Sequence, residues 1–364
     1  MTIPAGLSHG VKSPSATRVE FYDTIVVGGG QAGLAAGYHL AQKDIDFLIL
    51  DGSDRVGDSW RNRWDSLQLF TPARYSGLPG LPFPASPLDL PDKNQVGDYL
   101  ERYAERFDLP VRSGTRVNHL ERDGDRFVLH NGHVTYQANS VIVATGPFQK
   151  PRVPAIASRL PRAVQQFHSS EYRNPSQLPP GDVLVVGAGN SGAQIAMELA
   201  QSRRVWLAGR ESGHLRRRFL GRDLYDWMWP IFTRFDAETM IGRRMKRRTR
   251  STDPLIGIAP SDIVRSGVTR VGRLTEVRDG QPFCEGLGVD PDVVIWCTGF
   301  AADYSWIDLP VFGDDGYPRH DRGVVAEAPG LYFLGLRFQH RRTSALIGGV
   351  GADAAHIAEV IQKS

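Results

Sequence analysis

The fold of the first half of this chain is decided by the segment Tyr22-Asp-Thr-Ile-Val-Val-Gly28-Gly-Gly30-Gln31-Ala32-Gly33. An apolar strand leads into a glycine turn, and a helical pattern and a second apolar strand, Phe47–Leu50, follow. Gly28 lets the chain turn tightly, Gly30 lets the backbone approach a pyrophosphate, and Gly33 lets the helix pack closely on the strand. The order strand, turn, helix, strand predicts a Rossmann-like dinucleotide-binding unit.

A carboxylate closes the second strand of this unit. Asp51 stands 18 residues after Gly33, at the place where an acid accepts hydrogen bonds from the ribose hydroxyls of a dinucleotide. A turn residue that merely ends the strand is the alternative interpretation. We expect Gln31 and Ala32, which lie inside the turn, to contact the same cofactor.

The pattern recurs in the middle of the chain, around Gly187-Ala-Gly189-Asn190-Ser191-Gly192. Apolar strands are predicted at 182–186 and 205–207, with a helix between them. Counting 18 residues on from Gly192 leads to Arg210, so the second copy has a base where the first has an acid. A guanidinium attracts and pairs with a 2'-phosphate, which a carboxylate repels. The second site is therefore expected to prefer NADPH, with NADH as a weaker option, unless Arg210 is only a solvated loop cation.

Two dinucleotide sites in one chain indicate an electron path from a nicotinamide to a second cofactor. FAD is the cofactor that fits the carboxylate-type site. Two further apolar strands each end in a Thr-Gly turn, Thr145-Gly146 and Thr298-Gly299. Such turns bring the chain close to a dinucleotide as it passes between domains.

Other segments carry a resemblance to a known family. They are Gly57-Asp-Ser-Trp60-Arg61-Asn-Arg-Trp-Asp-Ser-Leu67, the run Phe70-Thr71-Pro72, the run Leu78 to Pro84, and the C-terminal Gly330-Leu-Tyr-Phe-Leu-Gly335. Together with both glycine turns they make the chain similar to the flavin-containing monooxygenases, specifically their short bacterial members. The likeness spans nearly the whole chain.

The resemblance implies the site and the reaction. Trp60 and Arg61 belong to the segment that packs along FAD in that family, and Gly335 belongs to the return of the chain to the FAD domain. Phe70 and Thr71 are expected beside the flavin, and His168 is expected to line the nicotinamide cleft or to make a structural hydrogen bond. The activity implied is NAD(P)H-dependent insertion of one oxygen atom of O2 into a sulfide, an amine or a ketone through a flavin C4a-hydroperoxide.

We predict an α/β fold with two Rossmann-like dinucleotide-binding domains, the second inserted into the first. Residues 1–20 are expected to form a loose tail. Residues 21–150 and 314–364 are assigned to the FAD domain, and residues 151–313 to the NAD(P)H domain.

The composition of the chain argues against several other classes of protein. The net charge of +3 comes mainly from Arg216 to Arg218 and from the segment 243–250, so nucleic-acid binding is not indicated. No apolar run is long enough for a membrane span. The only cysteines, Cys284 and Cys297, match neither a CxxC redox pair nor a metal-ligand spacing. We therefore expect a cytoplasmic protein without metal that acts on a small molecule and O2, and a homodimer is compatible with the sequence.

Two alternatives stay open, and a third is disfavoured. A flavin reductase would pass electrons from NADPH to a quinone, to another acceptor or to O2, and the lack of an Asn between Trp64 and Gly80 keeps this reading open. A disulfide reductase is disfavoured because no CxxC is present. A sensor of NADP+ would use the arginines of 243–250 to bind an acidic partner, although a solvated helix face explains that run more simply.

Overall fold

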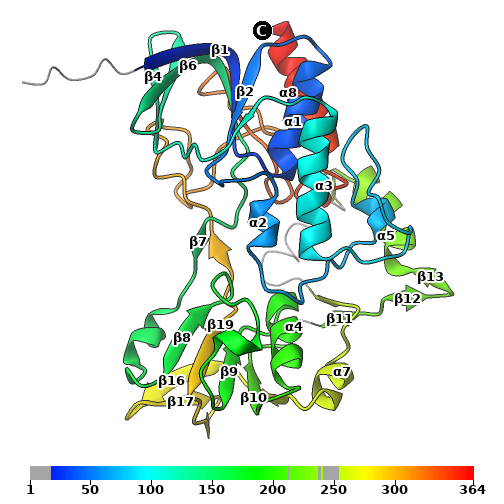
Figure 1. Cartoon of the computed structure of the whole chain (residues 1–364), viewed down its shortest axis with the longest axis vertical. Coiled ribbons are helices and arrows are strands. Elements are labelled where there is room, and N and C mark those ends of the chain that lie inside the picture. Colours follow the sequence, from blue (N-terminus) through cyan, green and yellow to red (C-terminus); the bar gives the residue numbers. More distant parts are fainter. Residues whose placement is uncertain (1–17, 212, 237–238, 241–253) are drawn as a thin grey trace, which may run out of the picture.

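The computed structural model describes residues 18–211, 213–236, 239–240 and 254–364, and Figure 1 shows them as two α/β units, one above the other. The first unit is built on a sheet in the order β3-β2-β1-β6-β5-β4, with β21 paired to β6. Its strands are β1 (Arg18–Val27), β2 (Phe47–Leu50), β3 (Val111–Arg112), β4 (His119–Asp123), β5 (Arg126–His130), β6 (Val134–Val143) and β21 (Leu331–Phe333). The strands β3, β2, β1, β6 and β21 run parallel to one another. β5 is antiparallel to β6, and β4 is antiparallel to β5 at the edge of the sheet.

The second unit has a sheet in the order β15-β10-β9-β19-β8, in which every pair is parallel. Its strands are β8 (Gln165–His168), β9 (Val183–Val186), β10 (Val205–Ala208), β15 (Thr269–Val271) and β19 (Val293–Trp296). β9, β10 and β19 are buried along their whole length, as expected for parallel strands covered on both faces. The prediction of an α/β fold with parallel sheets is confirmed.

Helices and short strands complete the two units. The helices are α1 (Gln31–Ala41), α2 (Asp58–Arg61), α3 (Lys93–Arg106), α4 (Asn190–Leu199), α5 (Leu224–Arg234), α7 (Pro260–Arg265) and α8 (Gly351–Lys363), with short 3-10 turns at Ala73–Tyr75, Ala155–Arg159 and Pro175–Gln177. The short strands are β7 (Lys150–Pro151), β11 (His214–Leu215), β12 (Arg218–Phe219), β13 (Arg222–Asp223), β14 (Leu255–Ile256), β16 (Leu274–Arg278), β17 (Gln281–Cys284), β18 (Leu287–Gly288) and β20 (Phe300–Ala301).

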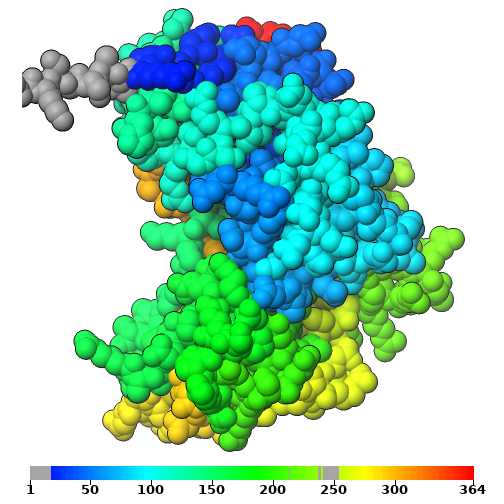
Figure 2. All heavy atoms as spheres, in the orientation of Figure 1, coloured from blue at the N-terminus to red at the C-terminus, as the bar shows by residue number. Residues whose placement is uncertain are grey.

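A two-stranded antiparallel ribbon connects the two units. β7 carries the chain from the first unit to the second, and β20 carries it back, with Phe300 opposite Pro151 and Ala301 opposite Lys150. Figure 1 shows β7 between the two units, and Figure 2 shows the surface indented at this level. Every strand of the second sheet thus lies between two segments of the first, which agrees with an insertion.

The domain boundaries remain proposals. Residues Tyr304 to Phe312 pack with the core of the first unit, and Ile307 bridges to Leu120 of β4. We therefore propose that the chain returns to the first unit directly after β20, earlier than residue 314. At the other end of the chain, β1 begins at Arg18. Residues 18–20 are therefore strand and not tail, since they pair with the start of β6. Residues 1–17 lie outside the described residues.

Both glycine-turn helices begin with a polar residue. α1 starts at Gln31 and α4 at Asn190, each directly after a glycine in extended backbone, Gly30 or Gly189. The polar residues of the first helical turn hide these starts from a hydrophobic pattern. The helix therefore presents its first N–H groups at the glycine turn itself.

Candidate cofactor and active site

The first glycine turn is packed closely on one side and open on the other. A Cβ at Gly33 would lie 1.8 Å from the carbonyl oxygen of Gly28, and a Cβ at Gly28 would lie 2.7 Å from that of Ala144. Gly28 also has a φ of +109°, which favours glycine. At Gly30 a Cβ would meet nothing within 4 Å. No side chain caps the N-terminus of α1 and no acid stands in its first turn, so the turn fits a phosphate group at the positive end of the helix.

Asp51 lies beside this turn. Its carboxylate accepts a hydrogen bond from the N–H of Gly29 at 3.1 Å and one from the N–H of Ser53 at 2.9 Å. On the other side, a Cβ at Gly335 would lie 3.0 Å from the Cβ of Ala32. The structure therefore brings the predicted residues Ala32, Asp51 and Gly335 together around one turn, although they come from three separate segments.

The second glycine turn repeats this geometry. A Cβ at Gly192 would lie 1.8 Å from the carbonyl oxygen of Gly187, and one at Gly187 would lie 2.2 Å from that of Cys297. Gly189 is open, as Gly30 is, and α4 has neither a capping side chain nor an acid in its first turn. The second turn therefore fits a phosphate group in the same way.

The polar residues of the second site are used differently. The Asn190 side chain donates to the carbonyl oxygen of Pro254 at 3.2 Å and accepts from the N–H of Ile256 at 3.0 Å, so it anchors β14. Ser191 is half-buried in the first turn of α4. Arg210 is exposed just beyond β10, and among the described residues none accepts a hydrogen bond from it. Its guanidinium is therefore free to pair with an anion.

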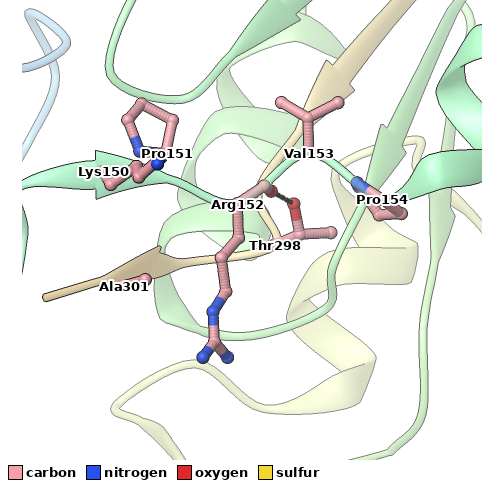
Figure 3. A pocket seen from close by; sticks show the side chains of 7 residues that line it. All are labelled: Lys150, Pro151, Arg152, Val153, Pro154, Thr298 and Ala301. Carbon is pink, nitrogen blue, oxygen red and sulfur yellow. Dashed lines mark hydrogen bonds between the residues drawn. The ribbon is translucent and has the colours of Figure 1, made fainter. Parts of the chain in front are cut away.

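The two Thr-Gly turns differ in their contacts. Thr145 accepts a hydrogen bond from the side chain of Gln149, and Gly146 has a φ of +69°. Thr298 donates to the carbonyl oxygen of Arg152, and the N–H of Arg152 donates to Gly299 at 3.0 Å. Figure 3 shows this hydrogen bond between Thr298 and the backbone of Arg152, and both residues line a cavity of about 470 Å³ beside β7 and β20. The second turn is thus tied to the ribbon between the units.

His168 is buried at the end of β8 with both ring nitrogens engaged. Nε2 lies 3.0 Å from the carbonyl oxygen of Gly299, and Nδ1 lies 3.2 Å from the N–H of Ser170, which donates to it. Nε2 therefore carries the proton and donates to Gly299. Burial lowers the pKa of His168. The contacts support the structural reading, in which His168 positions the Thr298-Gly299 turn.

Trp60 and Arg61 point in different directions. The Trp60 indole donates to the side chain of Gln31 at 3.2 Å, so it reaches the first turn of α1. The Arg61 guanidinium pairs with Asp98 and Glu101, both at 2.9 Å, and donates to the carbonyl oxygen of Val56 at 2.6 Å. Its charge is satisfied by protein groups, so the side chain of Arg61 joins α2 to α3 and is not brought to the glycine turn.

Phe70 and Thr71 meet residues that the sequence reasoning missed. Arg217 donates to the carbonyl oxygen of Phe70 at 2.5 Å and pairs with the buried Asp223 at 2.7 Å. Thr71 is 5% exposed. Burial raises the pKa of Tyr225 to about 12, and a hydrogen bond with the Thr71 side chain partly offsets this rise. The segment that contains α5 therefore covers the loop expected beside the flavin.

A local signal marks this helix. Asp223 caps α5 and Asp226 returns the contact to the N-cap, which is a capping box directly before an aromatic run. The aromatic run Tyr225 to Phe232 lies within α5, and Tyr225 is the residue of this helix that is buried. Its docking on Thr71 joins residues more than a hundred positions apart, which no local pattern reveals.

The two cysteines are free and do not resemble a redox pair. Burial raises the pKa of Cys284 to about 11 and that of Cys297 to about 12, so both stay protonated thiols near neutral pH. Among the described residues no helix is both long and apolar enough to span a bilayer. The arginine-rich segment 243–250 lies outside the described residues.

Comparisons with known proteins identify the family of this chain. Residues 25–246 match a family model described as pyridine nucleotide-disulphide oxidoreductase. A CzcO-like uncharacterized oxidoreductase of Geobacillus kaustophilus is 43% identical over 92% of this chain and 97% of its own length. The indole-3-pyruvate monooxygenase YUCCA1 of rice is 30% identical over 93% of this chain and 90% of its own.

A solved structure is similar over the same span. The flavin-containing monooxygenase of Stenotrophomonas maltophilia superposes with a TM-score of 0.78 at 28% identity, covering 94% of this chain and 99% of that protein. Sequence and structure therefore agree on the family. The chain belongs to the pyridine nucleotide-disulphide oxidoreductase family, in its flavin monooxygenase group, and is a flavin-dependent oxidoreductase.

Proposed function

We propose that this protein is an NADPH-dependent FAD monooxygenase. In the reaction, NADPH, a proton, O2 and a substrate give NADP+, water and the substrate carrying one oxygen atom. The observation that carries the proposal is the repetition of one phosphate-binding geometry at two glycine turns, one in each unit. An enzyme that used a single dinucleotide would need one such turn.

Named residues would hold each cofactor. Gly28, Gly30 and Gly33 would receive the FAD pyrophosphate, with Asp51 at the ribose. The remaining members of the proposed FAD site are Gln31, Ala32, Trp60, Thr145, Gly146 and Gly335. The NADPH site would comprise Gly187, Gly189, Asn190, Ser191, Gly192, Arg210, Thr298 and Gly299. When bound, the flavin would supply hydride acceptance and the activation of O2.

The protein groups around the proposed flavin site would orient the reactants and keep water out. Thr71 and Tyr225 are both buried where α5 meets the 70–76 loop, and Arg217 holds Phe70 through its backbone. A dry pocket limits the decay of reactive oxygen to peroxide before a substrate meets it. Neither the mechanism nor the site requires a side-chain acid or base, because the cofactors carry the redox chemistry.

The substrate class follows from the reaction. A sulfide, an amine or a ketone has the reactivity to accept one oxygen atom. The name of the rice relative supports the ketones, because indole-3-pyruvate is a keto acid. A cytoplasmic location and a homodimer are part of the same proposal, and the protonated, unpaired state of both cysteines supports a reducing compartment.

A second function has its own supporting observation. Phe70 and Thr71 occupy the loop expected beside the flavin, and Trp64 to Gly80 offers no Asn amide there. A site without such a donor would favour release of hydrogen peroxide over oxygen transfer to a substrate. The protein would then be an NADPH-dependent flavin reductase or oxidase that passes electrons to O2, to a quinone or to another acceptor.

Stoichiometry tests the choice between them. Purified flavin-loaded protein is given NADPH and a thioether or ketone, and NADPH, product and hydrogen peroxide are quantified. One product molecule per NADPH, with little peroxide, supports the monooxygenase. One peroxide per NADPH at every substrate concentration contradicts it and supports the reductase.

A further inference from the structure

A guanidinium lies where the two units meet, and no carboxylate balances it. Arg63 follows α2, and its Nε donates to the carbonyl oxygen of Ser59 at 3.1 Å. Among the described residues, none accepts a hydrogen bond from its two terminal nitrogens and none forms an ion pair with it. The charged neighbour that most affects it is another cation, Arg173, which adds to burial in lowering the pKa of Arg63.

Two aromatic rings that contact each other lie beside this guanidinium, and they come from the two Thr-Gly turns. The Arg63 Cζ lies 5.7 Å from the ring centre of Phe148, which follows Thr145-Gly146, and 5.2 Å from that of Phe300, which follows Thr298-Gly299. The two rings meet edge to face at 5.5 Å. Contacts of this kind hold the cation in place without using its hydrogen-bond donors.

The backbone of Arg63 is fixed as well. Lys93, which is buried, donates to the carbonyl oxygens of Arg61 and Arg63, both at 3.0 Å, and pairs with Asp65 at 2.6 Å. Asp65 also accepts from Asn174 of the second unit at 2.7 Å. The nearby acid is thus engaged elsewhere, and Arg63 is held in a set position at the seam.

Among the described residues Arg63 has no anionic partner, and a half-buried cation in that state is costly. Its two free terminal nitrogens suit a phosphate. Phe300 links Arg63 to the second glycine turn. It stands three residues after Cys297, and the carbonyl oxygen of Cys297 packs against Gly187 of that turn. Phe148 is 62% exposed, which leaves an open aromatic face beside the guanidinium. We propose that Arg63 binds a phosphate oxygen of the nicotinamide dinucleotide, reaching from the FAD-side segment across the seam.

This inference rests on the proposed use of NADPH and gives Arg63 a role in holding the two units around it. A dinucleotide bound at the second glycine turn would gain one contact from the first unit. Binding would then be coupled to the approach of the units, since the ligand contacts both.

The test measures the dissociation constant of NADP+ for the FAD-loaded protein by calorimetry, without turnover. We expect Arg63→Gln to weaken binding by about tenfold or more, the loss of one charge-assisted contact. Arg63→Lys, which keeps the charge and loses the fork, should fall between. The matched control is Arg204→Gln, because Arg204 also stacks on an aromatic ring, Trp206 at 4.5 Å, but is exposed.

The contact also predicts a weaker dependence of NADP+ affinity on salt in Arg63→Gln than in wild type, because one phosphate contact is lost. Equal affinities for wild type and Arg63→Gln would overturn the inference while leaving the proposed function intact. Loss of flavin with unchanged NADP+ affinity would also overturn it, by assigning Arg63 to an FAD phosphate. If Arg63→Gln fails to fold, an unchanged affinity in Arg63→Lys has the same meaning. Failure of the wild-type protein to bind NADP+ would contradict the proposed function itself.

Discussion

In the first glycine turn, Gly33 stands so close to Gly28 that a Cβ on Gly33 would lie 1.8 Å from the Gly28 carbonyl oxygen. Gly192 and Gly187 repeat this relationship at 1.8 Å in the second turn. The helix thus rests directly on the turn that precedes it, a geometry that suits a phosphate at the N-terminus of the helix.

The repetition predicts two separable defects. Gly33→Ala should lower flavin content and Gly192→Ala should leave flavin bound but weaken NADP+ binding, because each methyl group forces its own turn apart at a cost of about 1–3 kcal/mol. Flavin absorbance per protein and NADP+ calorimetry measure the two effects. If Gly192→Ala lost flavin and kept NADP+ affinity, the assignment of the two turns would be reversed.

The second prediction concerns the choice of nicotinamide dinucleotide. Arg210→Ala should raise the KM for NADPH about tenfold or more and change the KM for NADH little, since a charge-assisted pair with the 2'-phosphate is lost. Arg210 is exposed and lacks a hydrogen-bond acceptor among the described residues, so folding should be unaffected. Equal effects on both dinucleotides would refute phosphate recognition.

The third prediction concerns the segment that covers Phe70. Arg217→Met leaves the Asp223 carboxylate, with 6% of its side chain exposed, without its cation. Breaking such a pair costs on the order of 3–5 kcal/mol. We therefore expect α5 to release from the loop, which increases both proteolytic cleavage of residues 213–236 and the peroxide formed per NADPH.

The matched control for this change is Arg218→Met, because Arg218 is the exposed neighbour on β12. It should behave as wild type in both measurements. Wild-type proteolytic cleavage and a wild-type peroxide yield in Arg217→Met would contradict the prediction that α5 protects the site.

How far the sequence predicted this site depends on the range of the contacts. The glycine turns and Asp51 were found because their geometry is set within about thirty residues by the strand-turn-helix unit. Arg61 was assigned to FAD, yet its charge is taken up by Asp98 and Glu101 on α3. A pattern along the chain does not reveal partners on another element.

His168 shows the same limit. Its residue type fits a cleft or a structural hydrogen bond equally well, and Gly299, its partner, is 131 positions away. The parallel pairing of β8 with β19 brings the two together. Arg217 and Tyr225 were missed for the same reason, because Phe70 and Thr71 lie on a distant segment.

The fourth prediction is a pH dependence of stability. Burial lowers the pKa of His168 below its unfolded value, so the unfolded chain binds the proton more readily. The contribution of neutral His168 to the stability of the fold is fully present above pH ~6.5, the usual pKa of His, and is lost as the pH falls below that value. Melting temperatures between about pH 5 and pH 8 should therefore decline at the acidic end.

His168→Gln should make that decline shallower. Part of it should remain, because burial also lowers the pKa of His39, His340 and His356. The exposed His133 provides the control variant His133→Gln. An unchanged acidic slope in His168→Gln would contradict the neutral, hydrogen-bonded state of His168.

In the proposed reaction, O2 meets reduced flavin in a protected site. The direct measurement is to reduce the purified protein with one equivalent of NADPH without oxygen, mix it rapidly with O2 and follow the near-ultraviolet absorbance. We predict a transient spectrum distinct from reduced and oxidised flavin, with less peroxide released when a thioether or ketone is present. A direct return to oxidised flavin with one hydrogen peroxide per NADPH, whether or not substrate is added, would contradict the account.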